Sequence, residues 1–303
     1  MRILVTGGSG FIGAQLCATL QERGHEVISV DDHRVLPLAP SPSFEVRTSV
    51  EDLSKKDLEG FDVVYHLASN KSIPESFERP ISYLDNAEAT ANLLHCARQA
   101  GVERIFIGST CEVFGDQPQQ PLLEDALLAP RSPYAMTKAI SEMYSGIYSR
   151  ASETRIVVVR IFNTYGPYER PDAVVPAMCR DALREGRIVI EGSGEQKRDF
   201  TYIDDMVQKL ASLMEVSDLP SAVNLGSGKS TSIQEIAQLV QKIALEHGDP
   251  TSIDWRSSRI NEISDFQSST SLQNQLNLPK PQIDLSEGVL KTYLWWKEYL
   301  NHD

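Results

Sequence analysis

The chain has 303 residues, of which 41% are hydrophobic and 23% are charged. This composition is ordinary for a globular protein and excludes a disordered chain. The length predicts one large domain or two modest ones. The net charge of −13 argues against a nucleic-acid-binding protein that depends on bulk positive charge. A small anionic ligand is not excluded, because it needs only a few cationic or backbone N–H groups nearby.

The lengths of the apolar runs and the spacing of the cysteines indicate the cellular compartment. The longest apolar runs have the length of a strand and fall far short of the roughly 20 residues of a membrane span, and the N-terminal run is too short for a secretory leader. The four cysteines form neither a CxxC pair nor a Cys/His cluster, so we predict no metal site and no disulfide framework. We therefore expect a cytoplasmic protein that binds neither membranes nor nucleic acid.

Short apolar runs alternate with helical patterns over the first half of the chain. Strands are predicted at 2–5, 25–30, 62–66, 104–107 and 155–160, and helices at 11–23, 83–99 and 134–150. Runs rich in Val and Ile without alternation, spaced by helices, are typical of a parallel sheet covered on both faces. We therefore predict an α/β fold with a doubly wound (Rossmann) domain over residues 1–166.

The pattern loosens after residue 166. Helices are predicted at 172–185, 204–214, 232–246 and 286–300, and short strands near 188–190 and 223–225. These elements are too irregular for a second large sheet. We predict a smaller mixed lobe over residues 167–303, which closes over the ligand cleft of the first domain and returns some elements to its sheet.

A glycine-rich segment, GGSGFIG at 7–13, lies between the first predicted strand and the first predicted helix. Glycines allow a tight turn and a close approach to a pyrophosphate, whose charge the helix N-terminus favours. Asp31 follows the second strand, as the dinucleotide-binding fingerprint requires. This acid can accept hydrogen bonds from ribose hydroxyls and would repel a 2′-phosphate, which favours NAD. Asp32 is a second acid, although His33 and Arg34 leave NADP open.

A second motif combines a tyrosine and a lysine. Tyr134 and Lys138 are four residues apart on a predicted helix and therefore share one face. An ammonium group near a phenol favours the phenolate, so Tyr134 can act as a base near neutral pH. Thr110 follows a predicted strand at the carboxyl edge, where open α/β sheets bind ligands. After a dinucleotide-binding half, this combination is poorly explained by chance.

At these residues the chain resembles the extended short-chain dehydrogenases/reductases, the NAD-dependent nucleotide-sugar epimerase/dehydratase family. The segments that carry the resemblance run almost end to end: TGGSGFIG at 6–13, Asp31, HLAS at 66–69, Asn86, STCEVFGD at 109–116, YAMTK at 134–138, RIFNTYGP at 160–167 and RDF at 198–200. The resemblance implies NAD as cofactor and a nucleotide-diphosphate sugar as substrate.

The resemblance also implies roles for single residues. Thr110 orients the sugar hydroxyl, Tyr134 takes the proton of the 4-hydroxyl, and Lys138 also holds the nicotinamide ribose. The predicted cofactor-binding residues are Gly7, Gly10, Phe11, Ile12, Gly13, Asp31, Asp32, Ser49, Val50, Leu67, Ala68, Lys71, Asn86, Tyr134 and Lys138. Ser49 stands where the family usually has an aspartate. The predicted substrate-binding residues, which hold the diphosphate, are Asn163, Arg198 and Arg259.

The residues after Thr110 separate the reactions within this family. Simple 4-epimerases usually have small residues there, 4,6-dehydratases have Thr-Asp-Glu, and nucleotide-glucuronate decarboxylases have Thr-Ser-Glu. This chain has Thr110-Cys111-Glu112, which is similar to UDP-N-acetylglucosamine 5,6-dehydratases of the tunicamycin-pathway type. Glu112 can remove the C5 proton, and the Cys111 thiol can assist departure of the 6-hydroxyl.

We therefore predict a lyase, an NAD-dependent dehydratase of a UDP- or dTDP-hexose, with UDP-N-acetylglucosamine as the best candidate. A UDP-hexose 4-epimerase and a nucleotide-glucuronate decarboxylase are the alternative enzymes. An NAD-sensing regulator is the non-enzymatic alternative, although such relatives tend to lose the Tyr/Lys pair that this chain keeps.

An apolar stripe at helical spacing follows the Tyr/Lys pair. It consists of Ile140, Met143, Tyr144, Ile147 and Tyr148. The resemblance implies that the helices at 83–99 and 134–150 form a four-helix interface, so we expect a homodimer. The alternative is that the stripe faces the protein's own sheet.

Overall fold

The central sheet confirms the predicted doubly wound α/β fold. The computed structural model describes residues 1–34, 38–257 and 263–302. Seven strands of this described chain form a parallel sheet in the order β10-β6-β5-β4-β1-β2-β3. The strands are β1 (Arg2–Thr6), β2 (Glu26–Asp31), β3 (Glu45–Arg47), β4 (Val63–His66), β5 (Arg104–Thr110), β6 (Arg155–Ile161) and β10 (Ala222–Leu225). The strand order reverses beside β1, and ligands bind at the carboxyl edge of such a switch point.

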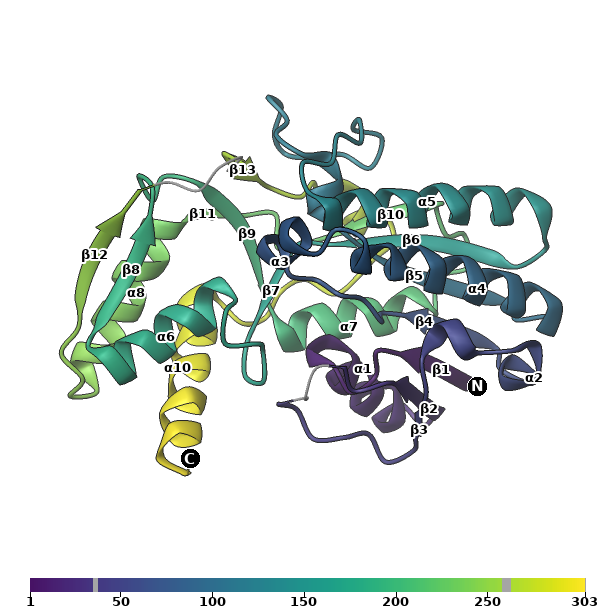
Figure 1. Ribbon diagram of the computed structural model, residues 1–303, viewed down its shortest axis with the longest axis horizontal. Coiled ribbons are helices and arrows are strands. Elements are labelled where there is room, and N and C mark those ends of the chain that lie inside the picture. Colours follow the sequence, from purple (N-terminus) through teal and green to yellow (C-terminus); the bar gives the residue numbers. More distant parts are fainter. Residues whose placement is uncertain (35–37, 258–262, 303) are drawn as a thin grey trace.

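Helices cover both faces of this sheet (Figure 1). The pair α1 (Phe11–Glu22) and α7 (Ile203–Leu213) packs on one face, and the pair α4 (Asp85–Ala100) and α5 (Pro133–Ala151) packs on the other, beside the short α2 (Lys55–Leu58). Successive residues of β1 point to opposite faces, because Ile3 belongs to the apolar cluster under α1 and Leu4 to the one under α4. The near-continuous apolar runs of these strands are explained by burial on both sides.

The second lobe contains smaller sheets. One centres on β9 (Lys197–Tyr202), with β7 (Asn163–Tyr165), β11 (Ser230–Ser232) and β13 (Asp265–Phe266). The other pairs β8 (Arg187–Glu191) with β12 (Ser252–Arg256). The lobe's long helices are α6 (Val174–Glu185), α8 (Ile233–Glu246) and α10 (Leu285–His302), and α9 (Ser271–Gln275) is short. In the first domain, the short α3 (Ile73–Glu78) precedes α4 and packs against α5.

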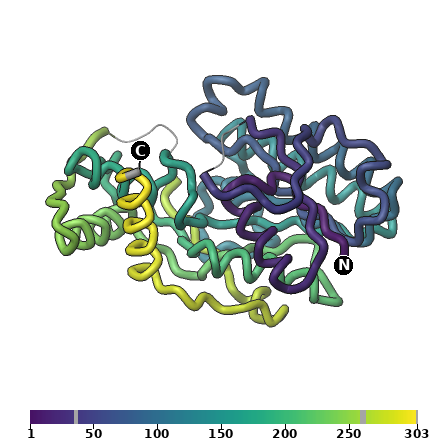
Figure 2. The backbone as a smooth tube through the Cα atoms, turned by 90° about the horizontal axis from the view of Figure 1, so that it is seen from below, coloured from purple at the N-terminus to yellow at the C-terminus, as the bar shows by residue number. Residues whose placement is uncertain are grey.

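Two elements that follow residue 166 return to the first domain. Strand β10 extends the sheet next to β6, with Val223 opposite Val159, and α7 lies against α1. Figure 2 shows the chain between α9 and α10 running along the outside of the molecule toward the second lobe. In the part of the chain that the structure describes, no helix has both the length and the apolar character needed to cross a membrane.

One strand is longer than its apolar run predicts. Strand β5 continues through Gly108, Ser109 and Thr110, which pair in parallel with Val159, Arg160 and Ile161 of β6. The sequence did not predict this extension, because its residues are small or polar and do not continue the apolar run. As a consequence, Thr110 belongs to the sheet edge itself.

Candidate active site

The predicted catalytic residues come from two neighbouring elements. Thr110 ends β5, and its Oγ1 accepts a hydrogen bond of 3.3 Å from the Glu112 N–H, which caps the 3₁₀ turn η3 (Cys111–Phe114). Helix α5 begins just before Tyr134, because the Ser132 hydroxyl accepts the Ala135 N–H at 3.1 Å and Pro133 occupies the first helical position. Local capping therefore brings both segments to the sheet edge.

Direct contacts join α5 to the end of β5. Lys138 Nζ donates to the Gly108 carbonyl at 2.9 Å, and the Thr110 hydroxyl hydrogen-bonds the Tyr134 phenol. Tyr134 and Lys138 are 8% and 4% exposed. The structure thus brings together Thr110, Tyr134 and Lys138, as their spacing predicts.

Burial dominates the electrostatics of this pair. It raises the pKa of Tyr134 above its usual value, Glu112 and Cys111 add to the increase, and the bond from Thr110 opposes it. Burial also lowers the pKa of Lys138 to about 8, while the Glu142 carboxylate opposes that decrease. A site that excludes water penalises the charged form of both groups, so Tyr134 needs a nearby cation to act as a base.

Cys111 and Glu112 share the charge environment of Arg198. Burial raises the pKa of Glu112, and the Arg198 guanidinium opposes the increase. Burial and the Glu112 charge raise the pKa of the Cys111 thiol well above its usual value. Cys111 therefore stays a neutral thiol, and Glu112 is a carboxyl group whose basicity is increased.

Two predicted substrate residues lie on the smaller sheet of the second lobe. Arg198 of β9 donates to the carbonyls of Lys197 at 2.7 Å and Ile263 at 2.9 Å. Asn163 begins β7, and its buried Oδ1 has no hydrogen-bond partner among the described residues. An orphaned buried oxygen indicates a place for a ligand donor. Arg259 lies outside the described residues.

The glycine-rich turn fits a dinucleotide pyrophosphate. Gly7 has a φ of +68°, and a Cβ there would lie 2.6 Å from the Ala68 nitrogen. A Cβ on Gly13 would lie 2.0 Å from the Gly7 oxygen. Helix α1 begins at Phe11, and within the described chain it has neither a side-chain cap nor an acidic residue in its first turn. Its N–H groups therefore remain available to an anion, with Gly10 at the N-cap position and the half-buried Ile12 in the first turn.

The residues around Asp31 support NAD over NADP. Asp31 ends β2, and its carboxylate accepts the N–H groups of Ser9 at 3.1 Å and His33 at 2.9 Å. Arg34 is the cation that could bind a 2′-phosphate. It is instead paired with three carboxylates, at 2.7 Å from Asp32, 3.1 Å from Asp85 and 3.5 Å from Glu51. These carboxylates leave little net positive charge there.

The next predicted cofactor residues follow strands β3 and β4 of the first sheet. The Ser49 hydroxyl contacts Glu51 and Arg34, and Val50 is buried in the next turn. Leu67 and Ala68 follow β4, where their N–H groups bond the Thr6 carbonyl at 3.0 Å and its hydroxyl at 3.3 Å.

Lys71 and Asn86 differ in the freedom of their side chains. The Lys71 Nζ lies 5.6 Å from the centre of the Phe11 ring. The Asn86 side chain is engaged in the protein itself: its Oδ1 accepts the Asn70 N–H at 2.8 Å, and its Nδ2 donates to the Asn70 carbonyl at 3.0 Å and the Thr137 hydroxyl at 3.2 Å. Asn86 therefore anchors the segment after β4 to α5.

Sequence reasoning missed Glu169. This buried residue follows β7, and burial raises the pKa of its carboxyl group to about 7, while Lys71 opposes the increase. Glu169 and Lys71 act on each other electrostatically, each favouring the charged form of the other. Its only sequence signal is an acid shortly after the Gly166-Pro167 turn, which many loops share.

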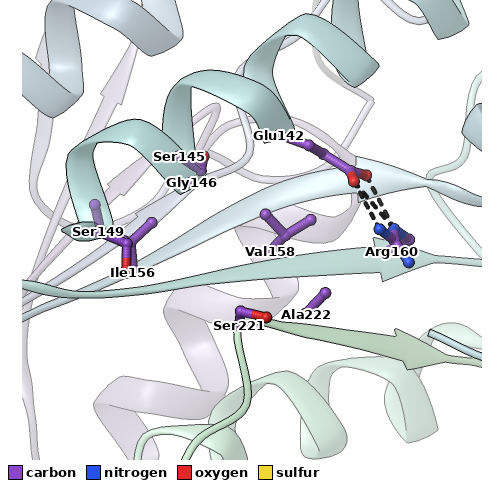
Figure 3. A pocket seen from close by; sticks show the side chains of 9 residues that line it. All are labelled: Glu142, Ser145, Gly146, Ser149, Ile156, Val158, Arg160, Ser221 and Ala222. Atoms are coloured by element: carbon purple, nitrogen blue, oxygen red, sulfur yellow. Dashed lines mark hydrogen bonds and ion pairs between the residues drawn. The ribbon is translucent and has the colours of Figure 1, made fainter. Parts of the chain in front are cut away.

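No described group of three or more His, Cys, Asp or Glu side chains could hold a metal ion. Two cavities of the described chain do not include the predicted catalytic residues in their linings. One of about 170 Å³ adjoins Glu142 and Arg160 (Figure 3). The other, of about 770 Å³, is lined by residues of β9, α9 and the segment before α10.

Comparisons with known proteins identify the family. Residues 3–226 match the model of the NAD dependent epimerase/dehydratase family. The chain belongs to the NAD-dependent epimerase/dehydratase family. This places it among the extended short-chain dehydrogenases/reductases, enzymes that use NAD, and leaves the NAD-sensing regulator without support.

Solved structures and curated relatives of the family span different reactions. TunA, described as an NAD-dependent NDP-hexosamine 5,6-dehydratase involved in tunicamycin biosynthesis, is 42% identical, with a TM-score of 0.92 over 98% of both chains. The UDP-glucuronic acid 4-epimerase of Bacillus cereus, in complex with UDP-4-deoxy-4-fluoro-glucuronic acid and NAD, is 28% identical, with a TM-score of 0.90 over 99% of this chain and 100% of that chain. UDP-glucuronic acid decarboxylase 1 of Xenopus tropicalis is 32% identical over 99% of this chain and 73% of its own length.

Proposed function

We propose that this enzyme is an NAD-dependent nucleotide-sugar 5,6-dehydratase that acts on a UDP-hexosamine, with UDP-N-acetylglucosamine as the best candidate substrate. The observation that carries the proposal is the buried Cys111 followed by the half-buried Glu112, whose charges act on Tyr134 and are opposed by Arg198. The likeness to an NDP-hexosamine 5,6-dehydratase supports it.

The proposed chemistry starts at C4 of the sugar. NAD, when bound, accepts a hydride from C4 and later returns it. Tyr134 takes the proton of the 4-hydroxyl, and Thr110 holds the same oxygen through its hydroxyl. Lys138, with a pKa of about 8, stays largely protonated at neutral pH and stabilises the phenolate.

Elimination then uses the residues after Thr110. The 4-ketone acidifies the C5 proton, and Glu112 removes it. The electron pair of the broken C5–H bond is first held in the C4–C5 enolate, which can take a proton back at C5 from Glu112. When the C6–O bond breaks, this electron pair forms the C5–C6 double bond and the Cys111 thiol protonates the leaving oxygen as water. The proton held by Glu112 then restores the thiol. The product has lost one water without net oxidation. Asn163, Arg198 and Arg259 hold the diphosphate, for which guanidinium groups are suited.

The predicted cofactor residues complete the proposal. The turn at Gly7, Gly10 and Gly13 and the start of α1 hold the pyrophosphate, and Asp31 holds the adenosine ribose. Lys71, close to Phe11, supplies a positive charge on the same side. A 4-epimerase needs only Thr110, Tyr134 and Lys138, so this alternative differs in whether Glu112 takes part.

An exchange experiment tests the proposed reaction. The enzyme is incubated in heavy water with UDP-N-acetylglucosamine, UDP-glucose and dTDP-glucose, and the products are followed by NMR. We expect loss of the 6-hydroxyl and of the original C5 proton for the preferred substrate. A product with an unexchanged C5 proton, an intact 6-hydroxyl and inverted C4 would contradict the dehydratase and establish the 4-epimerase, whereas release of carbon dioxide from a nucleotide-glucuronate would favour the decarboxylase.

We also propose that the enzyme forms a homodimer through α5 and its neighbour α4. Helix α5 buries small and polar residues within its own protomer: Thr137 and Ser141 hydrogen-bond to Asn86 and Thr90 of α4, and Ser145 is also buried. Its exposed face is apolar, with Met143 64% and Ile147 53% exposed. Tyr148 packs against the protein's own core, but the exposure of Met143 and Ile147 favours a second copy as the cover of the rest of the stripe.

Replacing Ile147 by glutamate should convert the dimer to a monomer, because a buried unpaired charge opposes association. Sedimentation at micromolar concentration measures the change. Leu245→Glu is the matched control, since Leu245 is 68% exposed on α8, and this variant should stay dimeric. A monomeric wild-type protein would refute the dimer.

A further inference from the structure

A buried ion pair lies directly behind the candidate active site. Arg160 of β6 donates from Nη2 to Glu142 Oε2 at 2.8 Å and from Nε to both carboxylate oxygens at 3.1 and 3.2 Å (Figure 3). The two side chains are 7% and 6% exposed. Arg160 also donates to the Glu124 carbonyl at 2.7 Å, and its guanidinium lies 4.8 Å from the centre of the Phe114 ring. The pair is therefore fixed on several sides.

The ion pair is linked to the last residues of β5. Ser109 Oγ donates to Glu142 Oε1 at 2.5 Å, and the preceding residue, Gly108, accepts Lys138 Nζ at 2.9 Å. Lys138 and Glu142 are one helical turn apart on α5. Two successive side chains of one helix face thus hold two successive residues of the strand, immediately before Thr110.

The charge of Glu142 also acts on Lys138. Its carboxylate favours the charged form of Lys138, whose pKa burial lowers. His66 of β4 is the ionisable group on another side, and because burial and Lys138 lower its pKa to about 3, it is neutral at neutral pH. Arg160 neutralises Glu142 from β6. Tyr134 precedes Lys138 by one turn on α5, and Glu112 acts on Tyr134.

We propose that Glu142 and Arg160 are positioning residues of the catalytic site: Glu142 holds the end of β5 through Ser109 and keeps Lys138 protonated, and Arg160 sets how much of the Glu142 charge Lys138 experiences. The proposal rests on the proposed roles of Thr110, Tyr134 and Lys138. The proposal predicts that loss of Glu142 and loss of Arg160 shift the titration midpoint of Lys138 in opposite directions. A purely structural ion pair predicts no such difference.

The decisive measurement is the titration of Lys138 in the intact protein. Lysine carrying ¹³C at Cε is incorporated, and Lys138→Met identifies the resonance. Glu142→Gln removes the negative charge, so the midpoint for Lys138 should move to lower pH by about one unit. Arg160→Met leaves the carboxylate without its counter-charge, so the midpoint should move to higher pH. Arg160→Lys keeps the charge and should restore the wild-type midpoint.

Several controls keep the test decisive. Asp205→Asn neutralises another buried carboxylate, which on α7 accepts the N–H groups of Gln282 and Ile283, and it should leave the Lys138 midpoint unchanged. If Glu142→Gln fails to fold, Arg160→Met carries the test, because the adjoining cavity of about 170 Å³ lets water reach the remaining carboxylate.

Activity supplies an independent reading. The high-pH limb of kcat should follow the Lys138 midpoint, moving down in Glu142→Gln and up in Arg160→Met, while KM changes little because neither residue touches substrate. Unchanged midpoints, or shifts in the same direction in both variants, would overturn the proposal. Since the titration needs no turnover, a wrong assignment of the reaction would leave this reading intact and so be distinguishable.

Discussion

Replacing Tyr134 by phenylalanine should lower turnover by about 10²–10⁴-fold, because the variant lacks the group that takes the proton from the 4-hydroxyl. Packing should persist. The Tyr134 ring contacts Tyr83 edge-on with centroids 6.5 Å apart, and phenylalanine keeps that ring. The only groups lost are the phenolic oxygen and its bond with Thr110. NAD should therefore stay bound to the variant. Steady-state assays measure the loss of turnover, and the NAD content of the purified protein measures the retained binding.

Tyr83→Phe is the matched control. Its hydroxyl donates to Glu75 Oε2 at 3.3 Å, so the variant removes a buried phenolic oxygen next to the site without removing the proposed base. It should retain most of the turnover. Near-normal activity of Tyr134→Phe would show that another group is the base and would remove the central step of the proposed reaction.

Six of the seven strands of the first sheet were predictable because they are buried on both faces, whereas the short edge strand β3 is largely exposed and was missed. Their apolar runs differ from the amphipathic pattern of the helices between them. Strand β9 was missed for the opposite reason. It is polar, and its central Asp199 is buried where Ser227 and Ser268 donate to the carboxylate at 2.6 to 2.8 Å. Those partners are distant in sequence, so no local pattern marks the strand.

The residues of the candidate site likewise divide into those that a local sequence pattern predicts and those that depend on contacts between distant segments. The glycine turn, Asp31 and the Tyr134/Lys138 pair follow from spacing within one strand–turn–helix or one helix. The Glu142–Arg160 pair depends on β6 lying beside β5, which no spacing reveals. Glu142 nevertheless continues the series of Tyr134 and Lys138 at four-residue steps, and that signal was available in the sequence.

Replacing Glu112 by glutamine should abolish exchange of the substrate C5 proton and slow elimination by about 10²–10⁴-fold, because glutamine keeps the shape of the side chain but cannot accept the proton. Oxidation at C4 should survive, since Thr110, Tyr134 and Lys138 are unchanged. NMR of the sugar in heavy water follows the exchange, and slow reduction of bound NAD reports the oxidation. Asp116→Asn changes a carboxylate of the same segment, whose Oδ1 accepts from the N–H and the hydroxyl of Ser264, and it should retain exchange.

The neighbouring thiol should matter less than the carboxylate. Cys111 is buried and neutral, and its role is to offer a proton to the departing 6-oxygen. A water molecule can replace such a donor, so Cys111→Ala should slow elimination while C5 exchange continues. The two variants thus separate the two halves of one elimination, because Glu112 acts on the C–H bond and Cys111 on the C–O bond. If Glu112→Gln still exchanged the C5 proton at the wild-type rate, the base would be another group, and the Cys111-Glu112 pair would no longer support a dehydratase.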